Sequence, residues 1–149
     1  MDRNSRQLKN YQITTMIKLR TAPINVRWGD MDSMGHVNNT LYFRFCEHIR
    51  MKWFASLDLS KDEHPDSLIV IINAFCEFLS PIRYPSTLVV DMHGSDPGKT
   101  SFMSHYTIRE EGDSDVHYAN GTAKIVWVDH TGTKSVPLPN SVSRLLESR

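Results

Sequence analysis

The chain has 149 residues, a length that fits one domain with a single core. Lysine and arginine together number 17, as do aspartate and glutamate, so the formal net charge is zero. This balance argues against strong non-specific binding to nucleic acid or to an anionic membrane, because both need a basic excess. No apolar stretch is long enough for a signal peptide or a membrane span, so we expect a cytoplasmic protein without a membrane partner. The two cysteines, Cys46 and Cys76, have apolar neighbours and are expected to be buried free thiols.

The opening of the chain is polar and predicts a loosely ordered extension over residues 1–20, followed by one domain over residues 21–149. Met16 could also be the natural start. We expect a short strand over residues 24–28. A loop that contains Gly35 should follow, up to Asn39.

Residues 40–57 predict a long helix, because apolar residues recur there at helical spacing. These residues are Leu41, Tyr42, Phe45, Cys46, Ile49, Trp53 and Leu57. The apolar stripe is wide, which predicts a helix largely surrounded by other structure. Asn38 or Asn39 is the expected N-cap, because an asparagine side chain can accept a hydrogen bond from a free N–H of the first turn.

Four further stretches, rich in residues that favour strands, follow this helix. They cover residues 68–79, 87–93, 101–109 and 116–128, and a short amphipathic helix ending in Leu145 and Leu146 follows them. In the last strand, Ala119, Gly121 and Ala123 share one face, and their small size would let a helix lie close to the sheet. One wide-striped helix against one antiparallel sheet predicts an α+β fold, and the uncovered side of the sheet favours a partner subunit.

The segment from Arg27 to Asn39 combines two carboxylates, a histidine and two amides just before the long helix. A helix N-terminus presents free N–H groups and partial positive charge, which suit a developing oxyanion. A carboxylate a few residues earlier can act as nucleophile or base on the same bound group. These residues permit acyl transfer, although a capped loop with an ordinary turn would have the same composition.

The same segment resembles the opening motif of the 4-hydroxybenzoyl-CoA thioesterase group of hot-dog-fold proteins. The family's Gly-Asp-x-Asp-x-x-Gly string is matched by residues 29–35, and its extension His-Val-Asn-Asn by residues 36–39. Residues 77–84 resemble the end of the family's second strand, and residues 126–139 resemble its last strand and tail. The resemblance covers residues 24–146, and several blocks in the right order make it more specific than the aspartate motif alone.

This resemblance implies a single hot-dog domain, in which an antiparallel sheet wraps a long central helix, and a homodimer or homotetramer. It implies hydrolysis of the thioester that joins an acyl group to coenzyme A, with no metal and no cofactor besides the coenzyme A of the substrate. The second aspartate of the motif is catalytic in the family, so Asp32 inherits the role of nucleophile or general base. The N–H that polarises the thioester carbonyl falls at Asn39, and Gly35 and Val37 are expected to contact the substrate.

The loop is also similar to plant-type acyl carrier protein (ACP) thioesterases, in which an asparagine two residues after the aspartate and a histidine four residues after it are catalytic. Met34 replaces that asparagine here, while His36 matches, so its role in catalysis or in shaping the loop stays open. An acyl-ACP thioesterase, a non-catalytic acyl-CoA-binding protein and a hot-dog dehydratase are the alternatives to an acyl-CoA thioesterase. Asp32 favours an enzyme, because a protein that only binds needs no carboxylate beside a thioester.

The remaining charged residues have simpler interpretations. Asp30 is expected to cap a turn or to pair with Arg27. The histidines outside the loop show no metal-ligand spacing, so we expect no metal site. In the family that the chain resembles, the nucleotide end of coenzyme A binds at a subunit edge, which makes Arg83 and Lys99 candidates for contacting its phosphates.

Overall fold

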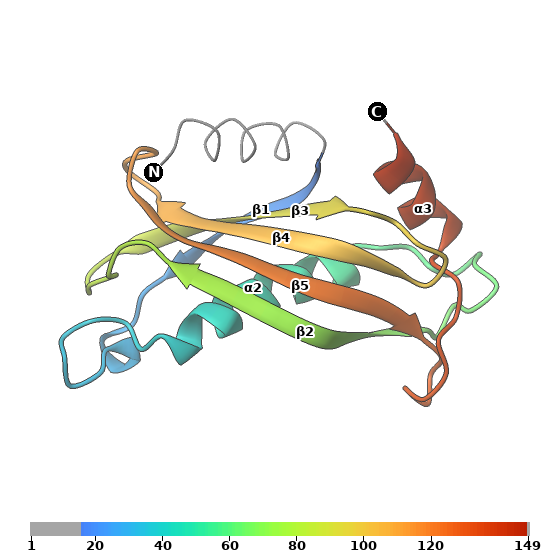
Figure 1. Cartoon of the computed structure of the whole chain (residues 1–149), viewed down its shortest axis with the longest axis horizontal. Coiled ribbons are helices and arrows are strands. Elements are labelled where there is room, and N and C mark those ends of the chain that lie inside the picture. The colour runs from blue at the N-terminus through green and yellow to red at the C-terminus, as the bar shows by residue number, and fades with distance from the viewer. Residues whose placement is uncertain (1–15, 149) are drawn as a thin grey trace.

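The computed structural model describes residues 16–148. Its strands are β1 (Ile17–Asn25), β2 (Leu68–Phe78), β3 (Thr87–Ser95), β4 (Ser101–Glu110) and β5 (His117–Val128). Its helices are the 3-10 turn η1 (Trp28–Asp30), the long helix α2 (Thr40–Ala55) and the short helix α3 (Asn140–Glu147). The strands form one antiparallel sheet in the order β1-β3-β4-β5-β2, and α2 lies against one face of it (Figure 1). The expected α+β hot-dog architecture is confirmed.

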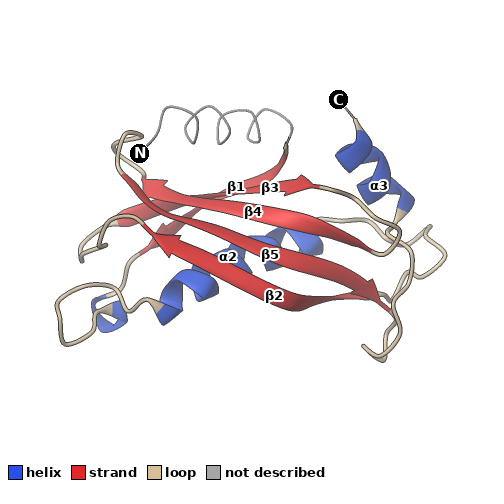
Figure 2. Ribbon diagram, viewed as in Figure 1, coloured by secondary structure: helices blue, strands red, loops and turns tan. Residues whose placement is uncertain are grey.

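The central part of the fold follows the predicted pattern closely. The four later strands begin and end within two residues of their predicted bounds, and α2 ends two residues before the expected position. Figure 2 shows this division, with the sheet as one layer and α2 as the second. No helix within residues 16–148 is long and apolar enough to cross a membrane.

The first strand was predicted in the wrong place. β1 runs over Ile17–Asn25 rather than residues 24–28, because the pairing of Arg27 with Asp30 folds the chain into η1 directly after the strand. β1 pairs only with β3, at the edge of the sheet, and an irregularity between Lys18 and Arg20 interrupts its alternation. Four residues that were expected in the loosely ordered extension therefore belong to the sheet. Residues 1–15 lie outside the described part of the chain.

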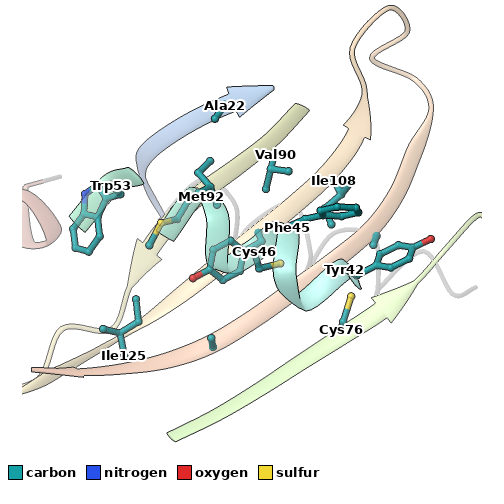
Figure 3. Close-up of a cluster of buried hydrophobic side chains, with 14 of the residues drawn as sticks. Ala22, Tyr42, Phe45, Cys46, Trp53, Cys76, Val90, Met92, Ile108 and Ile125 are labelled. Atoms are coloured by element: carbon teal, nitrogen blue, oxygen red, sulfur yellow. The ribbon is translucent and has the colours of Figure 1, made fainter. Parts of the chain in front are cut away.

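The core lies between α2 and the inner face of the sheet (Figure 3). Phe45, Ile49 and Trp53 are buried along the helix, and the Trp53 ring meets the edge of Trp127 with ring centroids 6.1 Å apart. The predicted close approach of the helix occurs at Gly121, where an added Cβ would lie only 3.3 Å from Cys46 Sγ. Cys46 itself is buried and free, as is Cys76, as expected.

Two histidines face each other on the opposite side of the sheet. His93 in β3 is directly opposite His105 in β4. Burial lowers the pKa of both imidazoles below the ordinary value of 6.5, and the nearby carboxylates Asp91 and Asp96 offset part of this effect. The folded protein therefore favours the neutral form of both side chains.

We expect this pair to make the fold sensitive to mild acid. As the pH falls, the two histidines are protonated first in the unfolded chain. The free energy of unfolding should therefore begin to decrease near pH 6.5 and should continue to decrease until the pH is below the lowered pKa values of the folded protein. Urea unfolding from about pH 7.5 to about pH 5.5 would measure the slope. A His93→Gln/His105→Gln variant should show a flatter profile. A wild-type profile that is already flat would rule out the effect.

Candidate active site

The loop between η1 and α2 forms a tight turn that presents Asp32. Met31 and Val37 pair in a short antiparallel bridge, the N–H of Asp32 donates to the carbonyl of His36 over 2.8 Å, and Gly35 N–H donates to the carbonyl of Asp32 over 3.0 Å. Gly35 has a φ of 78°, a left-handed conformation that glycine adopts without strain. The glycine of the motif thus closes the turn.

The side chain of Asp32 is held by its own turn. Its Oδ1 accepts a hydrogen bond from the N–H of Met34 over 2.9 Å. Its Oδ2 accepts no hydrogen bond from any residue that the structure describes, and the residue is partly exposed. One oxygen therefore fixes the orientation of the carboxylate, and the other is available to a bound molecule.

The start of α2 supplies the second polar group. Asn38 is the side-chain cap, because its Oδ1 accepts from the N–H of Thr40 over 3.0 Å and from the Thr40 hydroxyl over 2.8 Å. The carbonyls of Asn38 and Asn39 accept the N–H groups of the next turn. Between residues 16 and 148, no acceptor pairs with the N–H of Asn39. This donor lies at the positive end of the helix dipole and is free to bind an oxygen atom.

The segment that follows β2 forms the opposite wall. The N–H of Val37 donates to the carbonyl of Ile82 over 2.8 Å, which ties the loop to this segment. The ring of Tyr42 in α2 meets the edge of Phe78 with a centroid distance of 4.9 Å. Asp32, His36 and Asn39 lie with Tyr42 and Phe78 around one pocket of about 420 Å3. Three residues that the sequence placed in one loop thus share one cavity with an apolar wall.

His36 is bound by a residue from a distant part of the sequence. A guanidinium nitrogen of Arg83 lies 3.0 Å from His36 Nε2. Because a guanidinium can only donate, Nε2 must be the acceptor, and the proton of the neutral ring lies on Nδ1. In this arrangement Nε2 is occupied, and Arg83 places a positive charge at the rim of the pocket.

The structure separates two of the other candidate residues from this pocket. Gly35 shapes the turn and does not line the cavity, whereas Val37 is buried and lines it. Lys99 lies in the turn between β3 and β4, at the opposite end of the sheet from the Asp32 loop (Figure 1). Arg83 contacts His36, so the two candidates for contacting the coenzyme A phosphates lie at opposite ends of the sheet of one chain.

Asp30 has the structural role that was expected for it. Its carboxylate is buried and accepts hydrogen bonds from the backbone N–H of Arg27 over 2.8 Å and from the Arg27 guanidinium over 2.9 and 3.1 Å. It borders a larger hollow of about 660 Å3 on another side of α2. The carboxylate of Glu47 in that hollow is paired with Arg44. We place the site in the smaller pocket, because there a carboxylate oxygen and a backbone donor are both free.

Other reactive groups do not compete with Asp32. Burial raises the pKa of Cys46 to about 12 and that of Cys76 to about 11, so both thiols stay protonated at neutral pH and are poor nucleophiles. Within residues 16–148, no three histidine, cysteine, aspartate or glutamate side chains come together in a way that could hold a metal ion.

The sequence did not reveal the apolar wall of the pocket. Tyr42 was assigned to the core stripe of the helix and Phe78 to the end of a strand, and neither was expected in the pocket. The contact between Arg83 and His36 joins residues 47 positions apart and leaves no periodic pattern in the sequence. The one available signal was that residues 77–84 matched a block of the resembled family.

Comparisons with known proteins identify several relatives of this chain. A Pseudomonas aeruginosa protein, assigned provisionally as a thioesterase, is 38% identical, with a TM-score of 0.76 over 85% of this chain and 97% of that one. A Xanthomonas campestris protein, assigned provisionally as an acyl-CoA thioesterase, is 29% identical, with a TM-score of 0.69 over 81% of this chain and 99% of that one. A chloroplastic acyl-ACP thioesterase of Arabidopsis thaliana is 28% identical over 85% of this chain and 67% of its own length.

The family model of the thioesterase-like superfamily matches residues 26–146, which include the Asp32 loop, α2 and β2 to β5. That range also covers most of α3. With its hot-dog fold and a family model that matches most of its length, the chain belongs to the thioesterase-like superfamily and is a thioester hydrolase.

Proposed function

We propose that the protein hydrolyses acyl-CoA thioesters, with Asp32 as nucleophile or general base and the N–H of Asn39 polarising the thioester carbonyl. The observation that supports this proposal best is the shared pocket, in which a free carboxylate oxygen and a free N–H lie on one cavity wall. The Xanthomonas relative, assigned provisionally as an acyl-CoA thioesterase, supports coenzyme A as the carrier.

The proposed reaction needs only these groups and water. The carbonyl oxygen of the thioester accepts the N–H of Asn39, where the helix dipole stabilises the negative charge that develops on it. Asp32 either attacks the carbonyl carbon, so that water then hydrolyses the resulting mixed anhydride, or removes a proton from the attacking water. The leaving thiolate is only modestly basic, with a pKa near 8.5 by analogy with cysteine, so it needs little help from an acid.

His36 is better suited to position the loop than to act as a base. Its Nε2 is engaged by Arg83, and a second contact would have to be made through Nδ1–H, which can only donate. Met34 stands where the plant-type acyl-ACP enzymes carry a catalytic asparagine. Both observations favour coenzyme A over ACP as the carrier, although the Arabidopsis relative acts on acyl-ACP.

Arg83 is the residue that we expect to recognise the carrier, because its charge lies at the pocket rim beside His36. Thiol release from an acyl-CoA, followed with a thiol reagent, should exceed release from the same acyl group on ACP. Arg83→Gln should raise KM for the acyl-CoA on the order of tenfold, through loss of a charge-assisted bond to phosphate. The same variant should leave KM unchanged for the N-acetylcysteamine thioester, which has no phosphate.

Lys99→Gln is the matched control, since it removes one positive charge at the far end of the sheet. If Lys99→Gln raised KM for the acyl-CoA more than Arg83→Gln did, the phosphate-binding position would lie away from the Asp32 pocket. Binding of acyl-CoA without thiol release would identify a binding protein instead, and preferential release from acyl-ACP would make ACP the carrier.

Asp32→Asn separates catalysis from structure. The amide keeps the size of the side chain and its Oδ1 acceptor but is neither a competent nucleophile nor a useful base. We expect kcat to fall by a factor on the order of 10²–10⁴, as for loss of a general base, with little change in substrate binding. Steady-state kinetics on one good acyl-CoA would measure both parameters.

Asp30→Asn is the control for this variant, because Asp30 lies two residues away in the same motif. It weakens a buried bond to Arg27 and should lower the free energy of unfolding by about 1–3 kcal/mol, while the folded fraction keeps its kcat. If Asp32→Asn retained wild-type kcat and a His36 variant lost it, the assignment of the catalytic residue would be wrong.

We also propose that the protein assembles as a dimer, or as a dimer of such dimers, in which the edge of β2 joins two copies. This strand has a neighbour on one side only, and Ile72 and Phe75 are 58% and 64% exposed along it. Exposed apolar side chains on an unpaired strand edge favour pairing with a second copy.

Light scattering should give a mass of at least twice the 17.1 kDa of the chain. Phe75→Lys should lower the measured mass, because it places a charge in the proposed contact. Trp28→Lys is the matched control, since Trp28 is 77% exposed but lies in η1, away from β2. A monomeric wild-type protein at micromolar concentration, or equal effects of the two variants, would contradict this assembly.

A further inference from the structure

Arg50 is a buried cation with no carboxylate partner among residues 16–148. It lies in the middle of α2 and is only 9% exposed. Its guanidinium donates to the hydroxyl of Tyr106 over 3.1 Å and lies 5.9 Å from the centre of that ring. Its partner in this contact is neutral, and its remaining nitrogens are not closed off from solvent, so they can meet a further acceptor.

The partners of Arg50 cannot supply a negative charge. The Tyr106 hydroxyl accepts from Arg50 and donates to Ser104 Oγ over 2.8 Å, and Ser104 in turn donates to the carbonyl of Ala123 over 2.7 Å. Every proton in this chain of hydrogen bonds points away from Arg50. The guanidinium, with five donors, is therefore poised for a further acceptor.

Arg50 lies on the same side of α2 as Tyr42, which lines the pocket. Tyr42, Cys46 and Arg50 are four residues apart in α2 and so share one side of the helix. Tyr42 contacts Phe78, and Cys46 lies over Gly121, which pairs with Cys76 in β2. Figure 3 shows Tyr42 and Cys46 on α2 and Cys76 on β2. The helix therefore runs antiparallel to β2, and its successive turns meet successive inward-facing positions of the strand.

The next inward-facing position of β2 is Ala74, beside Arg50. Ala74 pairs with Ala123, and Ala123 pairs with Ser104, so these three residues form the row of the sheet that holds the Arg50 network. Although it faces the helix side of the sheet, Ala74 is exposed. The row of the sheet that Arg50 reaches through Tyr106 and Ser104 thus ends, at the edge of β2, in a small and exposed side chain.

A second copy paired through β2 would bring no carboxylate from that strand to this place. The one acidic residue of β2 is Glu77, and it alternates to the other face of the sheet, opposite Asn120. The ligand chemistry that fits Arg50 is a carboxylate, which a guanidinium binds through two parallel hydrogen bonds.

We propose that Arg50 is the anion-binding end of the acyl site and that the preferred substrates are thioesters whose acyl group ends in a carboxylate. This inference rests on the proposed function. The acyl chain lies between α2 and β2, with its thioester at Asn39 and Asp32 and its far end at Arg50. The eleven residues from Asn39 to Arg50 span about 16 Å of helix. A helical side chain leans back over the preceding turn, which leaves about 11 Å, or roughly nine bonds of an extended chain at ~1.2 Å per bond. This length fits a ten-carbon acyl group.

The test compares decanedioyl-CoA with decanoyl-CoA, which differ only in the terminal carboxylate. The wild-type protein should hydrolyse decanedioyl-CoA with a kcat/KM about tenfold or more above that for decanoyl-CoA. Arg50→Met keeps an unbranched apolar side chain but cannot bind a carboxylate, and it should reverse this preference. Thermal unfolding checks that the variant is folded. If the variant does not fold, the two kcat/KM values of the wild-type protein still show whether the terminal carboxylate is preferred.

Two outcomes would overturn the proposal, and they are distinguishable. Equal kcat/KM values for the two substrates in the wild-type protein would remove the carboxylate preference while leaving thioester hydrolysis intact. That result, together with a lower oligomer mass for Arg50→Met, would assign Arg50 to a partner subunit's anion. Failure to hydrolyse any acyl-CoA would overturn the proposed function itself.

Discussion

The close contact between α2 and β5 at Gly121 sets the distance between the helix and the sheet, and the site depends on that distance. With no side chain at Gly121, Cys46 can lie directly on the strand. One turn earlier, Tyr42 then reaches Phe78, and one turn later Arg50 reaches the hydroxyl of Tyr106. A bulky residue at position 121 would lift the helix from the sheet and move its N-terminus away from the segment after β2.

Two aspartates in one short motif differ in function because their surroundings differ. Asp30 is buried, and both its oxygens are held by Arg27, so it anchors the turn before the loop. Asp32 is partly exposed and has one oxygen committed to its own turn. The N–H of Asn39, at the end of the same loop, stays free. The side chain of Asn38 caps the helix by accepting from the N–H of Thr40 instead. Local hydrogen bonds thus divide the polar groups into those that build the loop and those that can act on a substrate.

Much of this arrangement could be predicted because it depends on local patterns. The helical spacing of Tyr42 and Trp53 located α2, and the pairing of Asp30 with Arg27 spans only three residues. β1 was misplaced because an edge strand with charged residues and an irregular register carries little alternation. The Arg83–His36 contact and the position of Lys99 depend on where distant segments meet in space, and neither spacing nor composition records that.

The two edges of the sheet have opposite characters, and this limits how far an assembly can grow. The β2 edge carries exposed Ile72 and Phe75 and has no proline, so it can accept another strand. The β1 edge carries Lys18, Arg20 and Pro23, and both charged side chains and proline oppose strand addition. If two copies join through β2, each end of the combined sheet is a β1 edge. The combined sheet therefore stops at two subunits instead of continuing into a fibre. The apolar β2 edge, which is unpaired in the single chain, is used up in the contact between the two copies.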